Sequence, residues 1–279
     1  MNNIYPFNSK IGFGTSGFGR IRGREDIDID TLTMALDTGY TVFDTAEQYS
    51  NGKCETLLGK AILRWNGDRS KIQIVSKLQP TNAVSKANVI KHFKDSLNRL
   101  QLDYIDVYLL HWYLPSIDMH GTVEAFLELK NQGLIRDIGL SNFNGPKIIT
   151  QWKDIELANG VTANSKEGCT ILQTRYSIVD RTIDKSLLNF ASKAYNLTIM
   201  AHSPFALGAA LKREELITIA NKEGITVSQL CLAWILRHNN TIVIPKSSSK
   251  ERMLENLSAS NIVLSQDAIN EIETLFPVA

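Results

Sequence analysis

Short runs of apolar residues, many of them β-branched, recur at steady intervals along the chain, and most are followed by a polar turn. Runs of this length and composition predict β-strands, because β-branched and aromatic side chains favour extended backbone. The pattern predicts eight strands, at residues 10–15, 41–45, 73–77, 105–112, 137–141, 170–173, 198–203 and 241–246.

The longer segments between these strands carry apolar residues every three or four positions, which is the period of an amphipathic helix. We expect helices at 30–38, 55–65, 86–100, 123–132, 185–195 and 227–238, and two more at 251–258 and 266–275. Loops are expected at 17–30 and 159–168, where the sequence shows no period. No Pro-rich or Gly-rich linker divides the chain, so we expect one domain over residues 1–279.

Repeated alternation of strand and helix predicts an α/β fold, and eight strands fit a closed parallel (β/α)8 TIM barrel. An open, doubly wound sheet is the alternative. It draws support from Gly12, Gly14 and Gly17, which satisfy the pattern GxGxxG, with Asp44 as the acid that binds a ribose. The residues after Gly17 read FGRIRGRED, which does not suit the first turn of a helix that holds a pyrophosphate, so we favour the barrel.

Polar residues stand at the C-terminal end of seven consecutive predicted strands. They are Asp44, Lys77, His111, Ser141, Gln173, His202 and Lys246. A lone polar residue in a strand is usually a core group with a satisfied hydrogen bond. Seven at the same end are hard to explain by packing, and the C-terminal ends of barrel strands are where active sites lie. The pattern therefore favours an active site at this mouth of the barrel.

Four residues at this mouth have side chains suited to proton transfer. A nearby ammonium lowers the pKa of a phenol from its ordinary value of about 10, and we expect Lys77 to do this for Tyr49. A buried lysine needs an anionic partner, for which Asp44 is the candidate. His111 would orient and polarise a carbonyl oxygen. Together they are expected to donate a proton to a carbonyl oxygen as negative charge develops there.

Composition narrows the classes of partner. Thirty Lys and Arg against 29 Asp and Glu give a net charge of +1, which excludes a bulk field for nucleic acid or an anionic membrane. Cys54, Cys169 and Cys231 lack the CxxC spacing of a zinc or redox site, and we expect no bound metal. The sequence has no apolar run of the roughly 20 residues that span a bilayer and no secretion signal, so we expect the protein in the cytoplasm. We also expect a monomer.

The residues at the strand ends carry a resemblance to the aldo-keto reductase family. FDTAEQY at 43–49 is similar to the family's Asp and Tyr motif, IVSKL at 74–78 to its lysine strand and YLLHW at 108–112 to its histidine strand. The resemblance continues, in the same order, through GLSNF and IPKSSSKERMLEN. It implies an NADPH-dependent carbonyl reductase on a (β/α)8 barrel. Tyr49 would donate the proton, Asp44 and Lys77 would tune it, and His111 would place the carbonyl.

The resemblance also implies a set of cofactor-binding residues. Ser141, Asn142 and Gln173 match positions that hydrogen-bond the nicotinamide carboxamide, and the residues from Lys246 onward match a clamp for the adenosine phosphate, so we infer NADPH over NADH. The alternative for KSSSKER is a solvated helix start that a serine caps. The full set is Thr15, Asp44, Ser141, Asn142, Gln173, His202, Ser203, Lys246, Ser247, Arg252 and Asn256.

Two positions depart from the family's usual pattern. His202 stands where an aromatic residue, often Tyr, stacks on the nicotinamide, and an imidazole offers less area and can carry charge. Ser16 stands where many members have a bulky aromatic, which favours a wider mouth. The expected substrate pocket consists of Ser16, Tyr49, His111 and Trp112, and loops at 17–26, 113–121 and 205–212 are expected to set specificity.

The expected activity is the reduction of an aldehyde or ketone by hydride transfer from NADPH. One alternative is a barrel that binds NADPH and serves as a sensor or accessory interaction subunit with little turnover. NADPH binding without turnover across a broad carbonyl panel would favour that alternative. An unrelated barrel lyase or hydrolase would need a metal site or phosphate loop, which the sequence does not show.

Overall fold

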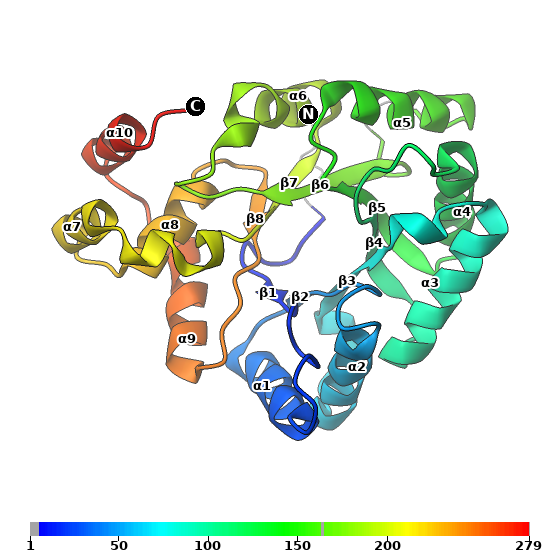
Figure 1. Ribbon diagram of the computed structural model, residues 1–279, viewed down its shortest axis with the longest axis horizontal. Helices are drawn as coiled ribbons and strands as arrows, with labels where there is room; N and C mark the ends of the chain where they lie inside the picture. Colours follow the sequence, from blue (N-terminus) through cyan, green and yellow to red (C-terminus); the bar gives the residue numbers. More distant parts are fainter. Residues whose placement is uncertain (1–5, 163–164, 279) are drawn as a thin grey trace.

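The computed structural model describes residues 6–162 and 165–278. Its eight parallel strands form one sheet in which each strand pairs with the next along the chain. The sheet closes on itself, because Ile11 pairs in parallel with Val243 and the Gly12 amide donates to the Val243 carbonyl at 2.8 Å. Figure 1 shows the strands at the centre and the helices around them. The (β/α)8 barrel is thereby confirmed, and the open doubly wound sheet is excluded.

The strands lie where the sequence predicts them, with small differences at their ends. Their bounds are β1 Phe13–Gly14, β2 Val42–Asp44, β3 Gln73–Leu78, β4 Ile105–Leu110, β5 Ile135–Ser141, β6 Cys169–Arg175, β7 Thr198–His202 and β8 Thr241–Val243. β8 is shorter than predicted because the chain soon reaches Pro245, which has no amide hydrogen to donate to a neighbouring strand. The Pro245 carbonyl still accepts from the Gly14 amide at 3.0 Å, so β1 and the end of β8 stay joined.

Ten α-helices surround the barrel in the part of the chain that the structure describes. They are α1 Glu25–Thr38, α2 Lys53–Trp65, α3 Lys86–Leu100, α4 Met119–Asn131, α5 Pro146–Ala158, α6 Leu187–Tyr195, α7 Glu214–Glu223, α8 Val227–Leu236, α9 Lys250–Ser258 and α10 Gln266–Leu275. Two of them, α5 and α7, are not among the predicted helices. The predicted loop at 159–168 joins α5 to β6, and its residues 163 and 164 lie outside the described residues.

The predicted loop at 17–30 is wrong in its second half, because α1 begins at Glu25. Glu25, Asp26 and Asp28 occupy the first turn of α1, where carboxylates interact favourably with the positive end of the helix dipole. Ile29 is buried one turn further on. The run of charges that read as a loop is therefore a helix start, and only the segment before it is a loop.

The strands place the candidate site through their alternating side chains. Successive residues of a strand point to opposite faces, so a residue and the second one after it share a face. An apolar cluster fills the barrel interior, and it includes Val42, Val75, Val107, Leu109, Ile171, Met200, Ile242 and Ile244. Two positions beyond members of this cluster stand Asp44, Lys77, His111, Gln173, His202 and Lys246. These polar residues therefore form the layer above the apolar interior, at the C-terminal mouth.

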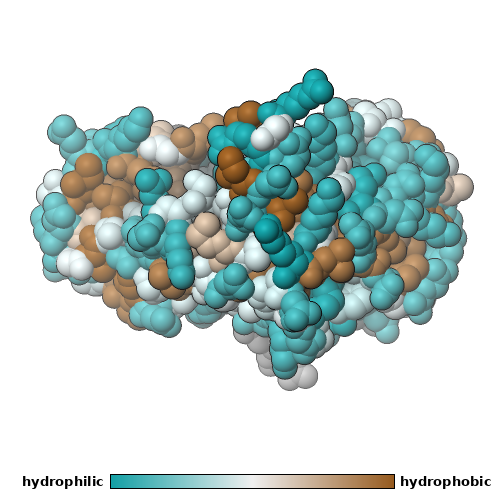
Figure 2. Space-filling view, turned by 90° about the horizontal axis from the view of Figure 1, so that it is seen from below, coloured by the Kyte–Doolittle hydropathy of each residue, from teal (hydrophilic) through white to brown (hydrophobic). Residues whose placement is uncertain are grey.

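The outer surface mixes polar and apolar residues. Figure 2 shows the face below the barrel of Figure 1, over α1, α2 and α9, where apolar side chains occur in small separate groups among hydrophilic ones. Ile27, Leu63 and Leu254 are each more than half exposed on these helices. None of the helices in the described residues is both long enough and apolar enough to cross a bilayer.

Candidate active site

A buried ion pair lies at the centre of the barrel mouth. Lys77, at the end of β3, is fully buried, and Asp44, at the end of β2, is 2% exposed. Lys77 Nζ donates to Asp44 Oδ2 at 2.8 Å, to the Thr45 carbonyl at 2.7 Å and to the Tyr49 hydroxyl at 3.2 Å. The ammonium thus has three oxygen partners, and it links the carboxylate to the phenol as predicted from the sequence.

His111 completes this group from the neighbouring strand. It follows β4 directly, and its amide donates to the Leu78 carbonyl at 3.0 Å, which extends the pairing with β3 by one residue. Its ring stands edge-on to the Tyr49 ring at 5.5 Å between centroids, and its buried Nδ1 has no hydrogen-bond partner in the described residues. Burial lowers the pKa of His111 to about 2, and the nearby Lys77 charge adds to this. The imidazole is therefore neutral at physiological pH.

The protonation states of Lys77 and Tyr49 follow from their burial and from the charged groups beside them. Burial lowers the pKa of Lys77, but the nearby Asp44 and Tyr49 outweigh burial, and the pKa stands above its ordinary value. Burial also raises the pKa of Tyr49, and Lys77 offsets only part of this. The expectation that Lys77 brings the phenol below its ordinary pKa is therefore wrong for this structure. Tyr49 holds its proton at neutral pH, as a proton donor must.

Amide side chains extend the network across the mouth. Gln173 Nε2 donates to Asp44 Oδ1 at 2.7 Å, and Ser141 Oγ donates to Gln173 Oε1 at 3.4 Å. Asn142 Nδ2 in turn donates to Ser141 Oγ and to the His111 carbonyl, both at 3.1 Å. Asn142 has a φ of 54°, in the left-handed region that asparagine tolerates better than most residues. One hydrogen-bonded chain therefore runs from Tyr49 to the far side of the barrel.

His202 joins the same network from β7. Its Nε2 lies 2.9 Å from Asn142 Oδ1, and its Nδ1 lies 3.0 Å from Ser203 Oγ. Burial lowers the pKa of His202 to about 4, with smaller contributions from the Lys77 and Arg175 charges. The imidazole is therefore neutral. Its two partners, Asn142 and Ser203, are themselves predicted cofactor-binding residues. Sequence reasoning places His202 in the site but does not anticipate this pairing.

Most of these residues, although not the buried Lys77, line a cavity of about 630 Å³. Among the predicted site residues, its lining includes Ser16, Asp44, Tyr49, His111, Asn142, Gln173, His202, Ser203 and Lys246. Thr15, Ser141 and Trp112 do not line it. Thr15 is buried with its amide bonded to the Asp44 carbonyl at 2.9 Å, and Trp112 packs against the His111 ring at 4.8 Å.

One wall of this cavity comes from the loops at 17–26 and 205–212, which the sequence predicts to set specificity without singling out individual residues there. Phe205, Leu207 and Leu211 line it from the segment after β7, and Arg20 lines it from the loop before α1. The apolar residues carry no periodic signal, because they lie in short 3-10 turns. The run of apolar residues around Gly208, directly after a predicted strand, is the signal that could have singled them out within the predicted loop.

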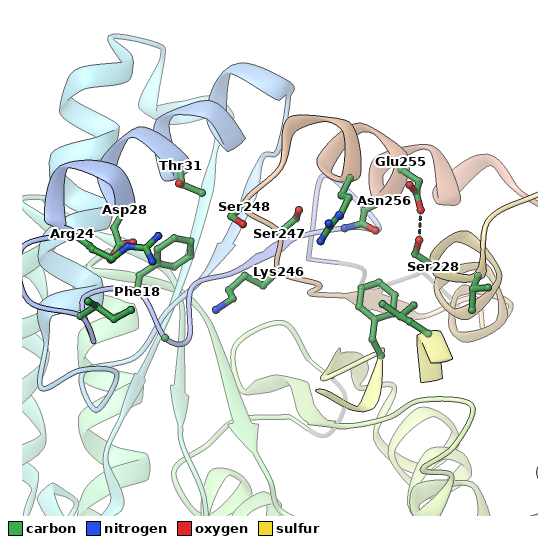
Figure 3. A pocket seen from close by; sticks show the side chains of 16 residues that line it. Phe18, Arg24, Asp28, Thr31, Ser228, Lys246, Ser247, Ser248, Glu255 and Asn256 are labelled. Atoms are coloured by element: carbon green, nitrogen blue, oxygen red, sulfur yellow. Dashed lines mark hydrogen bonds between the residues drawn. The ribbon is translucent and has the colours of Figure 1, made fainter. Parts of the chain in front are cut away.

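A second cavity, of about 570 Å³, lies between α1 and α9. In Figure 3, Arg24 and Asp28 stand on one side and Glu255 and Asn256 on the other, with Lys246, Ser247 and Ser248 between them. The predicted phosphate-binding residues Lys246, Ser247, Arg252 and Asn256 all line this cavity.

The solvated-start interpretation of KSSSKER holds for Ser249, and the phosphate interpretation stays a prediction. Ser249 Oγ caps α9 by accepting the Arg252 amide at 3.5 Å, as the solvated-start interpretation requires. Lys246 Nζ instead reaches the turn after β1, where it donates to the Ser16 carbonyl at 2.9 Å. The capping serine thus fixes the helix whose Arg252 faces the cavity.

The two cavities share Gly17, Phe205, Leu211 and Lys246, so they form one elongated cleft. One end offers amide donors and acceptors from Asn142 and Gln173, and the other offers cations and hydroxyls. A dinucleotide has this division, with a carboxamide ring at one end and phosphate groups toward the other. The residues present therefore fit a nicotinamide dinucleotide. No group of three or more His, Cys, Asp or Glu side chains in the described chain could hold a metal ion.

Comparison with known proteins identifies the class. The model of the Aldo/keto reductase family matches residues 10–276. Methylglyoxal reductase DkgB of Salmonella typhimurium is 33% identical over 261 residues, which cover 93% of this chain and 91% of that protein. The 2,5-diketo-D-gluconic acid reductase B of a Corynebacterium species is 28% identical, over 99% of this chain and 94% of that protein.

Among solved structures, an aldo-keto reductase from Klebsiella pneumoniae in complex with NADPH gives a TM-score of 0.84 at 35% identity, covering 96% of this chain and 91% of that one. The fold, the cleft and these matches define an NAD(P)H-dependent oxidoreductase that acts on carbonyl groups. The chain belongs to the aldo/keto reductase family.

Proposed function

We propose that this chain reduces an aldehyde or ketone to the alcohol with NADPH, and that Tyr49 is the proton donor. The observation that carries the proposal is the Tyr49 hydroxyl, which accepts from the fully buried Lys77 at 3.2 Å at the wall of the larger cavity. The relatives support it, because two are named as reductases of carbonyl compounds and one solved structure holds NADPH.

Each residue of the buried group has a part in the proton transfer. NADPH, when bound, supplies a hydride to the carbonyl carbon. His111, as a neutral imidazole, positions the carbonyl oxygen beside Tyr49. The Tyr49 hydroxyl donates its proton to that oxygen as negative charge develops on it. Lys77 stabilises the phenolate that remains, and Asp44 keeps Lys77 charged and in place.

The predicted cofactor residues divide between the two ends of the cleft. Thr15, Ser141, Asn142, Gln173, His202 and Ser203 would hold the nicotinamide end near Asp44. Lys246, Ser247, Arg252 and Asn256 would hold the adenosine phosphate. Both Lys246 and Arg252 are exposed cations at the second cavity, which supports a preference for NADPH over NADH.

The decisive experiment follows NADPH oxidation with a panel of aldehydes and ketones. Tyr49→Phe removes the transferable proton, so kcat should fall by about 10²–10⁴-fold, while the Kd for NADPH stays near the wild-type value. Tyr113→Phe is the matched control, because Tyr113 packs on Phe143 and lines neither cavity. Wild-type kcat in Tyr49→Phe would exclude the proton-donor role.

We further propose that residues 1–279 act as one domain and as a monomer in the cytoplasm. Cys54, Cys169 and Cys231 are all free and buried, which supports a reducing compartment. The mixed surface over α1, α2 and α9 supports the monomer. Light scattering at two protein concentrations tests this, and a concentration-dependent mass would contradict it.

A further inference from the structure

Arg20 lies in the loop before α1 and lines the catalytic cavity together with Tyr49 and His111. It is exposed to solvent, and among the described residues none forms an ion pair with it. We propose that Arg20 binds a carboxylate on the substrate, so that the enzyme prefers carbonyl compounds that also carry an acidic group. This proposal rests on the function proposed above and adds the substrate class.

The first argument is the charge around Arg20. A Cβ built on Gly17 would lie 3.1 Å from Lys246 Nζ and 3.9 Å from Arg20 Nε, so the two cations flank the same glycine. Burial lowers the pKa of Lys246, and the Arg20 charge lowers it further. The carboxylate that lines this cavity, Asp44, is already paired with Lys77. The mouth is therefore a cationic spot that an anion would stabilise.

The second argument is that Arg20 lies outside the predicted adenosine-phosphate site. Arg20 lines the cavity that contains Tyr49 and does not line the second cavity, where Arg252 and Asn256 lie. Lys246 faces both cavities and serves the phosphate end. The cation left for the substrate is thus Arg20.

The chemistry of the guanidinium selects the anion. Arginine presents two parallel N–H groups that match the two oxygens of a carboxylate. Phe205 and Leu207 line the same cavity, and their apolar side chains would pack against the body of the substrate. A compact aldehyde or ketone with a carboxylate at its far end fits this arrangement. The Corynebacterium relative is named for a substrate that is such an acid, 2,5-diketo-D-gluconic acid.

The test compares two aldehydes that differ in charge, 4-carboxybenzaldehyde and its uncharged methyl ester. Arg20→Gln should lower kcat/KM for the acid by about tenfold, because a charge-assisted contact is lost. The value for the ester should change less than about twofold, and the Kd for NADPH should not change. Arg22→Gln is the matched control, since Arg22 is an exposed arginine of the same loop that lines neither cavity.

Two further measurements sharpen the test. Arg20→Lys keeps the charge but loses the two-point contact, so it should restore part of the acid preference. Raising the ionic strength should lower the wild-type ratio of kcat/KM for the acid to kcat/KM for the ester, because salt screens an exposed charge.

The outcomes separate this proposal from the proposed function. Equal losses of kcat/KM for the acid and the ester in Arg20→Gln would overturn the carboxylate assignment and leave the reductase activity standing. A weaker Kd for NADPH in Arg20→Gln would also overturn it, because Arg20 would then belong to the cofactor. A wild-type chain that reduces neither aldehyde would contradict the proposed function, and this proposal with it.

Discussion

The two ends of the cleft hold their charges in opposite ways. At the catalytic end, Lys77 is fully buried and bonds to three oxygens, whereas at the phosphate end Lys246 and Arg252 are exposed. Proton transfer requires atoms to be held within a fraction of an ångström, and a buried network supplies this before any ligand arrives. Binding a phosphate requires charge more than fixed geometry, and exposed cations stay hydrated until the ligand replaces the water. In the proposed function, one cleft thus combines a rigid end for proton transfer with an adaptable end for phosphate binding.

The largest expected effect comes from breaking the rigid end. Lys77→Met leaves the Asp44 carboxyl buried without its cation, so the free energy of unfolding should fall by about 3–5 kcal/mol, and turnover should be lost. Urea denaturation measures the first and NADPH oxidation the second. The control is Lys222→Met, which removes the exposed pair with Glu271 and should cost about 1 kcal/mol or less. Equal losses of unfolding free energy in Lys77→Met and Lys222→Met would contradict the prediction that the buried pair matters more than the exposed one.

Acid should weaken the rigid end next. The pKa of His111 is about 2 in the folded chain, against about 6.5 in the unfolded chain, so the unfolded state takes up its proton first. The contribution of His111 to stability is therefore complete above pH 6.5 and is lost as the pH falls below it, at roughly 1.4 kcal/mol per pH unit. Urea denaturation at several pH values between 7 and 4.5 gives the free energy of unfolding as a function of pH. This free energy should fall less steeply with falling pH in His111→Gln than in the wild type. Identical slopes would mean that His111 is not buried as a neutral ring.

The smallest effect is expected at the adaptable end. Arg252→Ala should raise the Kd for NADPH about tenfold and leave the Kd for NADH nearly unchanged, because it removes one charge-assisted contact to the extra phosphate. Fluorescence titration with both cofactors measures this. Lys250→Ala on the same helix is the control, since Lys250 is exposed and lines neither cavity. Equal losses for the two cofactors would remove the phosphate role of Arg252.

The sequence predicts the barrel and the grouping of Asp44, Lys77, Tyr49 and His111 at its mouth, because the strand periodicity determines both. Val75 and Lys77 differ by two positions on β3, and that spacing alone places an ammonium above an apolar interior. The sequence did not predict the start of α1. Acidic residues at a helix start resemble a charged loop as long as the burial of Ile29 is unknown.

Side-chain pairings across the mouth were harder to predict. The bond between His202 and Asn142 joins residues 60 positions apart, and it depends on the left-handed backbone of Asn142. The balance between burial and the Lys77 charge at Tyr49 also requires coordinates, since sequence gives the neighbours of a phenol but not its depth. For the same reason the sequence did not show that Trp112, adjacent to His111, packs on the His111 ring and does not line the cavity.

The joint between β1 and the end of β8 bears on how the chain matures. Ile11 and Val243 are the first and last members of the barrel wall, and Lys246 reaches back from there to Ser16. During synthesis on a ribosome, β1 can pair with β2 early, but it cannot pair with β8 until nearly the whole polypeptide has emerged. A fragment that stops before β8 therefore lacks Lys246, Ser247, Arg252 and Asn256, four of the eleven residues proposed to bind the cofactor, and it should bind NADPH only weakly.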